Sequence, residues 1–153
     1  MYFPVFVSLE DKRCLVVGGG TIAVRRVRTL QRFCGDITVI SPSVCAEMEA
    51  IIKEHKICYL ERGYRSGDAE NAFLVVAAAN DRQVNHQVGE EAKAIGAFVS
   101  VADAKEECSF FFPGIVSEEE SGAVIGVCTS GRNHSLAKKL TARCRALLKD
   151  LIQ

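Results

Sequence analysis

The stretch CLVVGGGTIAVRR, residues 14–26, places three consecutive glycines directly after an apolar run. Glycine weakens the interior of a helix or a strand, so three together indicate a tight turn or a close approach of the backbone to another group. The apolar run favours a buried strand, and Ala23 and Val27 continue at helical spacing. The small residues follow the order G-x-G-x-x-A, which is typical of a dinucleotide-binding turn between a strand and a helix.

In such a turn the first glycine makes the bend and the second lets the backbone approach a pyrophosphate, while the third position keeps helix and strand close. The helix N-terminus presents unpaired N–H groups to the phosphates. A purely structural turn is the alternative interpretation. The sequence predicts cofactor contacts for Gly18, Gly19, Gly20, Thr21, Ile22 and Ala23.

The end of the next predicted strand lacks the acidic residue that usually binds the adenosine ribose about 20 positions after the turn. Residues 40–43 read Ile-Ser-Pro-Ser there, so the hydroxyl of Ser41 or of Ser43, on either side of Pro42, is the candidate ribose ligand. Without the carboxylate, the pattern does not distinguish NAD from NADP. Arg25 and Arg26 are candidates for a 2'-phosphate contact, with a solvated helix face as the alternative.

Strand-like and helix-like segments alternate around this turn. The pattern predicts an α/β fold, a Rossmann-type parallel sheet with helices on both faces. Beyond residue 113 an alternating run interrupted by SEEESG predicts a β-hairpin, and Ser135 is expected to cap a last helix. The expected strands are 13–17, 36–40, 56–60, 73–78 and 97–101, and the expected helices are 21–33, 44–54, 82–95 and 136–152.

Composition excludes several classes of function. Lys plus Arg (19) balance Asp plus Glu (19), so no overall field favours nucleic acid or an anionic membrane. The longest apolar run, residues 73–79, is far shorter than the roughly 20 residues that cross a bilayer, and we expect a cytoplasmic protein. The seven cysteines form no C-x-x-C pair, which argues against a zinc site and against a disulfide scaffold. We expect no dedicated metal site.

Polar residues follow two of the later predicted strands. Ala78, Ala79 and Asn80 end the fourth strand, where small side chains leave room for a nicotinamide, with tight packing as the alternative. Asp103 follows the fifth strand, where a partly shielded carboxylate can exchange protons. A helix cap or a loop carboxylate is the other interpretation of this residue. Arg132, Lys138 and Lys139 begin a basic final segment that suits a polyanionic ligand or forms a solvated face.

Taken in order, the motifs resemble the precorrin-2 dehydrogenase and sirohydrochlorin ferrochelatase family, the N-terminal module of siroheme synthase. The residues that carry the resemblance are FPVFVSLEDKRCLVVGGGTIAVRRVRTL, VISP, VVAAANDRQVN, VSVADAKEECSFFFPGIV and TSGRNHSLAKKL. The resemblance implies oxidation of precorrin-2 to sirohydrochlorin with NAD as cofactor and, in many members, insertion of ferrous iron to give siroheme.

The resemblance also assigns roles to parts of the chain. It implies an NAD-binding domain over residues 1–112 and, over residues 113–153, an arm that forms a homodimer and shapes the substrate cleft. The family's catalytic aspartate falls on Asp103. The family's usual Ser-Pro before the last helix is replaced here by Asn133-His134. The substrate's carboxylates are assigned to Arg132, Asn133, His134, Lys138 and Lys139.

Two rival functions fit parts of the pattern. A module that senses NAD or NADH without catalysis explains the glycine turn, but it gives no role to Asp103 or to the basic final helix. A protein that binds a tetrapyrrole and inserts metal without a redox step is the second rival. Release of NADH and sirohydrochlorin from precorrin-2 and NAD distinguishes the enzyme from both.

Overall fold

The computed structural model describes residues 2–152, which form two compact units. Residues 7–111 make up one unit, and the described residues outside that range make up the other. The first unit contains a five-stranded sheet and its covering helices. The second contains a two-stranded hairpin and one long helix.

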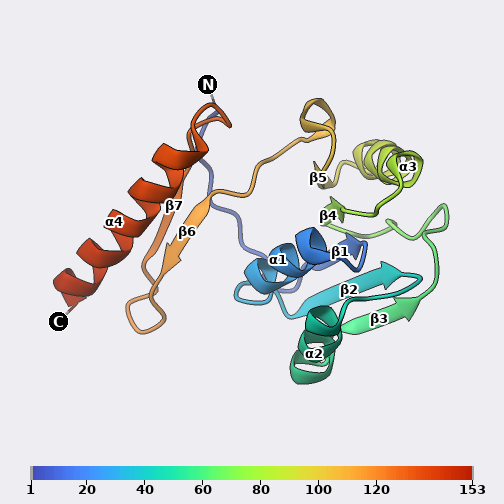
Figure 1. Ribbon diagram of the computed structural model, residues 1–153, viewed down its shortest axis with the longest axis horizontal. Coiled ribbons are helices and arrows are strands. Elements are labelled where there is room, and N and C mark those ends of the chain that lie inside the picture. Colours follow the sequence, from blue (N-terminus) through green and yellow to red (C-terminus); the bar gives the residue numbers. More distant parts are fainter. Residues whose placement is uncertain (1, 153) are drawn as a thin grey trace. The chain divides into compact units, whose positions relative to one another are not determined.

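The large sheet has the strand order β3-β2-β1-β4-β5, and all four of its strand pairings are parallel (Figure 1). Each of the five predicted strands is present, with bounds that differ by at most a few residues. The sheet therefore confirms the Rossmann-type α/β prediction. Its strands are β1 (Arg13–Val17), β2 (Asp36–Ser41), β3 (Cys58–Glu61), β4 (Leu74–Ala77) and β5 (Phe98–Val101).

Three helices provide crossovers between parallel strands. They are α1 (Thr21–Leu30), α2 (Ala46–His55) and α3 (Arg82–Ala94). Helices α1 and α2 contact one another, whereas α3 packs on β4 and β5. Right-handed crossovers that run in opposite directions from the sheet centre place α3 on the face opposite α1 and α2.

The core lies where these helices cover the central strands. Leu15, Val16, Val75 and Val99 are fully buried, as expected for strands covered on both faces. Burying each such side chain contributes roughly 1.5–3 kcal/mol. The continuous apolar runs of the sequence thus place β1, β4 and β5 in the core, although β5 is an edge strand of the sheet.

The direction of the crossovers reverses between β1 and β4. From β1 the chain proceeds outward to β2 and β3, and it then returns to β4 on the other side of β1 before continuing to β5. Ligands of open parallel sheets bind beyond the carboxyl ends of the strands at such a reversal. This edge, where Gly18 follows β1 and Ala78 follows β4, is the place to look for a site.

The connection from β3 to β4 runs through irregular turns that are held by charged pairs. The Arg62 guanidinium donates two hydrogen bonds to the Asp68 carboxylate, at 2.6 and 2.8 Å, and these bonds hold the pKa of Asp68 below its usual range. The Tyr64 hydroxyl donates to Glu91 Oε2 at 2.8 Å, and burial together with this carboxylate raises the pKa of Tyr64. These contacts tie the connection to α3.

The second unit contains the antiparallel strands β6 (Gly114–Ser117) and β7 (Val124–Val127), followed by α4 (His134–Ile152). Helix α4 packs on both strands, and a Cβ at Gly114 would stand 2.2 Å from Thr141 Oγ1. The predicted hairpin and last helix are therefore present. No helix in the described part of the chain is both long and apolar enough to cross a membrane.

The start of α4 corrects the sequence prediction. The helix begins at His134, and the Asn133 Oδ1 accepts a hydrogen bond from the Leu136 N–H at 2.8 Å. Asn133, and not Ser135, therefore provides the N-terminal cap. An asparagine two residues earlier does the same chemistry as the expected serine.

Candidate functional site

The glycine turn joins β1 to α1 at the carboxyl edge of the sheet. Gly18 has a φ of +127°, and a Cβ there would stand 2.2 Å from the Ala78 carbonyl oxygen. Its N–H donates to the Ile40 carbonyl at 2.8 Å, while the Ala78 N–H donates to the Val17 carbonyl at 2.8 Å. The turn is thus held between the ends of β2 and β4, and it requires glycine at its first position.

The next two glycines differ in what surrounds them. A Cβ at Gly19 would stand 2.2 Å from the Ser43 carbonyl oxygen and 2.9 Å from Ser41 Oγ, so this position packs against the loop after β2. A Cβ at Gly20 would meet no heavy atom of the described residues within 4 Å. Gly20 is exposed and precedes the first turn of α1. The turn therefore closes against the protein on one side and stays open at the third glycine.

The open side of the turn is the N-terminus of α1. The first helical turn contains no acidic side chain, and among the described residues no side chain caps it. Thr21 and Ile22 are exposed at this end, whereas Ala23 is fully buried where the helix meets the sheet. Unpaired N–H groups and the positive end of the helix dipole fit an anionic group such as a pyrophosphate. The residues present therefore fit a dinucleotide.

Two residues predicted near the adenosine stand where β2 ends: Ser41 is the last residue of β2, and Pro42 begins the loop after it. Pro42 is exposed, but Ser41 is buried and its hydroxyl donates to the Ser43 carbonyl at 2.6 Å. That hydroxyl shapes the loop beneath Gly19. Glu61, the last residue of β3, stands opposite Ser41 in the strand register and is exposed, so an acidic residue absent from the end of β2 is present on the neighbouring strand.

The two arginines of α1 take different environments. Arg25 is exposed, whereas Arg26 is half-buried. Burial, the charge of Arg25 and proximity to Cys108 all act on the pKa of Arg26, which lies below its usual value. Cys108 follows β5, on the far side of β1 from the end of β2.

The end of β4 leads directly into α3. Ala78 is buried, Ala79 is half-buried and Asn80 is exposed. Asp81 caps the helix by accepting hydrogen bonds from the N–H groups of the second and third helical residues, at 2.7 and 3.3 Å. The side chains of the two alanines are short, and both backbone polar groups of Ala79 are hydrogen-bonded to Asn85.

Asp103 lies in the turn after β5, at the same edge of the sheet. Its side chain is 38% exposed, and the preceding Ala102 N–H donates to the Ala77 carbonyl at 2.9 Å, which fixes the turn beside the end of β4. The Asn85 Nδ2 donates to Asp103 Oδ2 at 3.0 Å. A partly exposed carboxylate with one oxygen held by an amide is suited to accept a proton.

A group of charged side chains surrounds Asp103. Arg82 contacts Asp103 Oδ1 at 3.8 Å but makes its short contact with Glu107, which His86 also approaches at 3.1 Å. The hydrogen bond from Arg82 and the contact with His86 hold the pKa of Glu107 below its usual range. Glu107 therefore engages most of the charge of Arg82, and Asp103 is left with the longer contact.

Sequence analysis did not single out Asn85, Arg82 or Glu107. Asn85 occupies a position on the buried face of α3, three residues before Val88. The sequence feature that could have identified Asn85 is that it is a polar residue on the otherwise apolar face of the helix. Arg82 and Glu107 lie 25 residues apart in the sequence and meet only because β5 pairs with β4, so no local pattern identified their contact.

The residues predicted to bind substrate carboxylates lie in the second unit. The Asn133 side chain caps α4, and the Asn133 carbonyl accepts from Thr129 Oγ1 at 3.0 Å. The structure thus places these residues in the loop before α4 and along its first two turns. All five are exposed: Arg132, Asn133, His134, Lys138 and Lys139.

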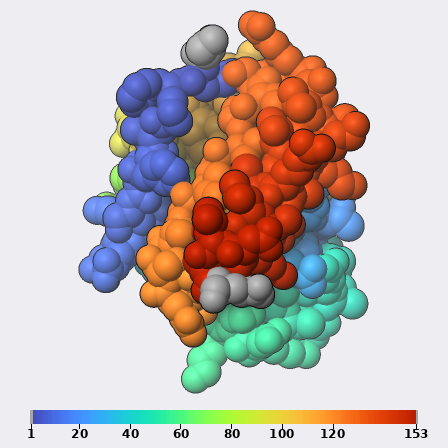
Figure 2. All heavy atoms as spheres, turned by 90° about the vertical axis from the view of Figure 1, so that its left-hand side faces the viewer, coloured from blue at the N-terminus to red at the C-terminus, as the bar shows by residue number. Residues whose placement is uncertain are grey.

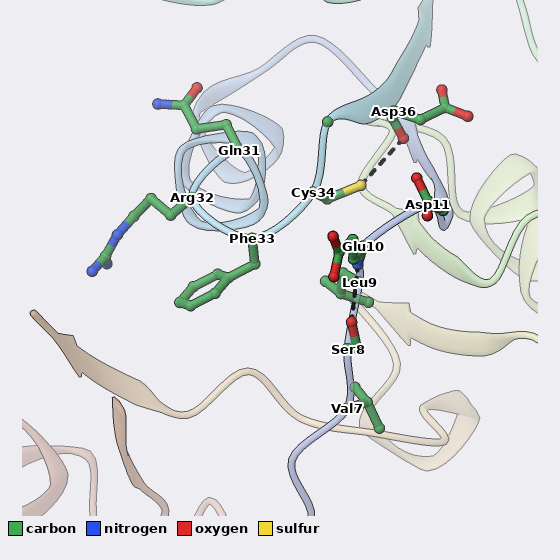
Figure 3. A pocket seen from close by; sticks show the side chains of 11 residues that line it. Val7, Ser8, Leu9, Glu10, Asp11, Gln31, Arg32, Phe33, Cys34 and Asp36 are labelled. Carbon is green, nitrogen blue, oxygen red and sulfur yellow. Dashed lines mark hydrogen bonds between the residues drawn. The ribbon is translucent and has the colours of Figure 1, made fainter. Parts of the chain in front are cut away.

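A pocket lies at the opposite edge of the sheet, where β1 and β2 begin. Figure 3 shows the Cys34 thiol pointing to the Asp36 carbonyl, to which it donates at 3.4 Å, with Glu10 and Asp11 nearby. This pocket does not suit a dinucleotide, because three carboxylates line it and the glycine turn lies at the other edge of the sheet. The lining residues are Val7, Ser8, Leu9, Glu10, Asp11, Gln31, Arg32, Phe33, Cys34, Gly35 and Asp36.

Known proteins are similar to almost the whole of this chain. A probable multifunctional siroheme biosynthesis protein from Ruminiclostridium josui is 47% identical over 146 residues, which cover 95% of this chain and 28% of that protein. A siroheme synthase from Mannheimia succiniciproducens is 36% identical over 147 residues, which cover 96% of this chain and 30% of that protein. The chain thus spans less than a third of the length of these relatives.

A solved structure and a family match complete the comparison. The structure of SirC, a precorrin-2 dehydrogenase, superimposes with a TM-score of 0.82 at 26% sequence identity, covering 95% of this chain and 70% of that one. Residues 5–114 match the family described as putative NAD(P)-binding, and this range contains the whole glycine turn and Asp103. The chain therefore belongs to the putative NAD(P)-binding family, and it is similar to part of siroheme synthase and to SirC.

Proposed function

We propose that this chain oxidises precorrin-2 to sirohydrochlorin with NAD as the hydride acceptor. The observation that carries the proposal is the placement of the glycine turn and the Asp103 carboxylate at one edge of the sheet, connected through Ala79 and Asn85. A nucleotide-sensing module requires the turn but gives no reason for a carboxylate held beside it. The precorrin-2 dehydrogenase activity named for SirC further supports the proposal.

The chain's residues divide the work of this reaction. NAD, when bound, supplies the nicotinamide ring that accepts a hydride. The N-terminus of α1 and the backbone of Gly19 and Gly20 would hold the pyrophosphate, and the end of β4 would border the ring. Oxidation removes one hydride and one proton from the macrocycle, and Asp103 accepts the proton as conjugation extends.

The exposed cations of the second unit are the proposed partners of the substrate carboxylates. Arg132, Lys138 and Lys139 carry positive charge on one segment of a chain that has no net charge. Asn133 and His134 complete this set, although the Asn133 side chain already caps the helix. Insertion of ferrous iron into sirohydrochlorin is a second candidate reaction, which the siroheme synthase names of the relatives favour, with iron as substrate.

The assay for the proposed function mixes purified protein with precorrin-2 and NAD under anaerobic conditions. We expect sirohydrochlorin and NADH to form in equal amounts, because each oxidation transfers one hydride. Both products are measured by their absorbance. Addition of ferrous iron then tests the second reaction through the spectrum of siroheme. Binding of NADH without any product would favour the sensing module.

We further propose that the chain forms a homodimer through α4. One side of this helix packs on the hairpin, but another side carries four exposed leucines, Leu136, Leu140, Leu147 and Leu151, with Leu147 58% and Leu151 73% exposed. Figure 2 shows the outer side of α4, in red, open to the viewer. An apolar helical stripe of this length is typical of an association surface.

Self-association is measured by sedimentation equilibrium. We expect a dimer at micromolar concentration, and we expect Leu147→Lys to shift the protein to the monomer because a charge would be buried in the interface. Lys149→Ala, on the opposite side of the same helix, is the matched control and should leave the dimer intact. A monomeric unchanged protein would contradict the proposal.

A further inference from the structure

Asn85 of α3 joins the backbone at the end of β4 to the Asp103 carboxylate. Its side chain is 1% exposed, and it makes three hydrogen bonds: Oδ1 accepts from the Ala79 N–H at 2.8 Å, and Nδ2 donates to the Ala79 carbonyl at 3.0 Å and to Asp103 Oδ2 at 3.0 Å. We propose that Asn85 is a positioning residue, which fixes Asp103 relative to the backbone that borders the nicotinamide. The inference rests on the proposed function.

An asparagine at this position has a cost that the fold alone does not explain. Position 85 lies on the buried face of α3 together with Val88 and Ala92, where apolar residues are otherwise used. Burying an amide is unfavourable unless its hydrogen bonds are made, and here they are made to a backbone segment beyond the end of the sheet and to one carboxylate. The amide therefore specifies a particular arrangement of these two groups.

The other contacts of the turn that contains Asp103 fix the carboxylate less directly. Cys108 supports the turn backbone: its Sγ accepts from the Val101 N–H at 3.2 Å and donates to the Val101 carbonyl at 3.3 Å. Arg82 reaches Asp103 Oδ1 only at 3.8 Å because its short contact is with Glu107. Asn85 thus holds Oδ2, and Oδ1 is the oxygen that remains available to take a proton.

The substitution Asn85→Asp isolates the amide donor, since it preserves shape and the acceptor for the Ala79 N–H. It places a second carboxyl, buried, next to Asp103. Burial and a neighbouring negative charge both disfavour ionisation, so the pKa of the introduced carboxyl in the folded state rises above its unfolded value of about 3.9. Stability is then retained at low pH and lost as the pH rises through the folded-state pKa.

The first measurement is the melting temperature of the protein without nucleotide, from pH 4.5 to pH 8. We expect the melting temperature of Asn85→Asp to fall below that of the unchanged protein by an amount that grows with pH, to on the order of 5 °C at pH 8. Asn71→Asp is the matched control, because Asn71 is exposed at the other edge of the sheet. Its difference from the unchanged protein should stay small at every pH.

The second measurement exchanges the two groups. In the double variant Asn85→Asp, Asp103→Asn, the amide introduced at position 103 donates to the carboxylate introduced at position 85. The melting temperature at pH 8 should therefore recover towards that of the unchanged protein. Turnover of precorrin-2 should not recover, since the carboxylate then lies at the buried position.

The third measurement is the steady-state rate of precorrin-2 oxidation. We expect Asn85→Asp to lower kcat on the order of 100-fold while changing the KM for precorrin-2 less than about twofold, because the misplaced carboxylate affects proton transfer more than binding. In the Asp103→Asn background the same substitution should cause no further loss. A non-additive pattern of this kind shows that Asn85 acts through Asp103.

Specific outcomes overturn the inference. Equal pH dependence for Asn85→Asp and Asn71→Asp, or no recovery in the exchanged pair, would show that Asn85 and Asp103 are not coupled. Full kcat in Asn85→Asp, or additive losses in the double variant, would show that Asn85 does not position Asp103. If the unchanged protein fails to oxidise precorrin-2, the proposed function falls, whereas loss of coupling with normal turnover in the unchanged protein overturns the inference alone.

Discussion

Asp103→Asn is expected to bind NADH as tightly as the unchanged protein and to oxidise precorrin-2 at least about 100-fold more slowly. The amide keeps the shape of the carboxylate, and its oxygen still accepts the hydrogen bond from Asn85. It has no basic oxygen that takes up a proton at neutral pH. The loss therefore reports on proton transfer and not on the shape of the site.

The structure makes this variant interpretable because folding should be preserved. The Asp103 side chain is 38% exposed, and Arg82 keeps its close partner Glu107 after the substitution. We expect a change in unfolding free energy of less than about 0.5 kcal/mol. Initial rates, NADH fluorescence titration and urea denaturation are the measurements, and Glu106→Gln, an exposed carboxylate three residues further along the chain, is the control. Turnover within threefold of normal would remove Asp103 from the chemistry.

The glycine turn gives the second large effect. Gly18→Ala should lower the free energy of unfolding by about 2–4 kcal/mol and abolish NADH binding. The backbone there has a φ of +127°, which a residue with a side chain rarely adopts, and the new Cβ would lie 2.2 Å from the Ala78 carbonyl oxygen. Relief of this clash must separate the turn from the end of β4.

Gly20→Ala is the matched variant, which tests whether the turn binds the phosphates of the dinucleotide. Its φ of −90° is open to alanine, and the described residues leave its Cβ without a neighbour within 4 Å. The unfolding free energy should change by less than about 0.5 kcal/mol. NADH affinity should nevertheless fall about tenfold or more, since the methyl group occupies the space where phosphate approaches the helix. Unchanged affinity would place the phosphates elsewhere.

Much of the sheet was predictable from the sequence because its signals are local. Runs such as residues 14–17 and 74–77 are apolar throughout, as strands covered on both faces must be, and three glycines locate the turn that follows the first of them. Helix ends were less well specified. Helix α1 ends at Leu30, whereas the apolar spacing extended the prediction to residue 33, and α4 begins at His134 because Asn133 caps it.

Residues of the candidate site were predictable only where the residue type itself indicates the proposed role. Gly18 and Asp103 can be identified from the sequence alone, because each has a residue type suited to its proposed role and comes shortly after a predicted strand. Asn85 does not, because its role depends on α3 packing against β4 and β5 so that one amide reaches both Ala79 and Asp103. The engagement of Ser41 with its own loop likewise depends on the path of the backbone after β2.

The order of strands in the sheet also has a consequence for how the protein forms during synthesis. The ribosome completes β1, β2 and β3 first, but β1 obtains its second neighbour only when Leu74–Ala77 has emerged. Until then one edge of the largely apolar β1 is unpaired in a nascent chain, which makes it a target for aggregation or chaperone capture. A pause in translation before β4 has left the ribosome would lengthen that exposure, whereas one after its emergence would not.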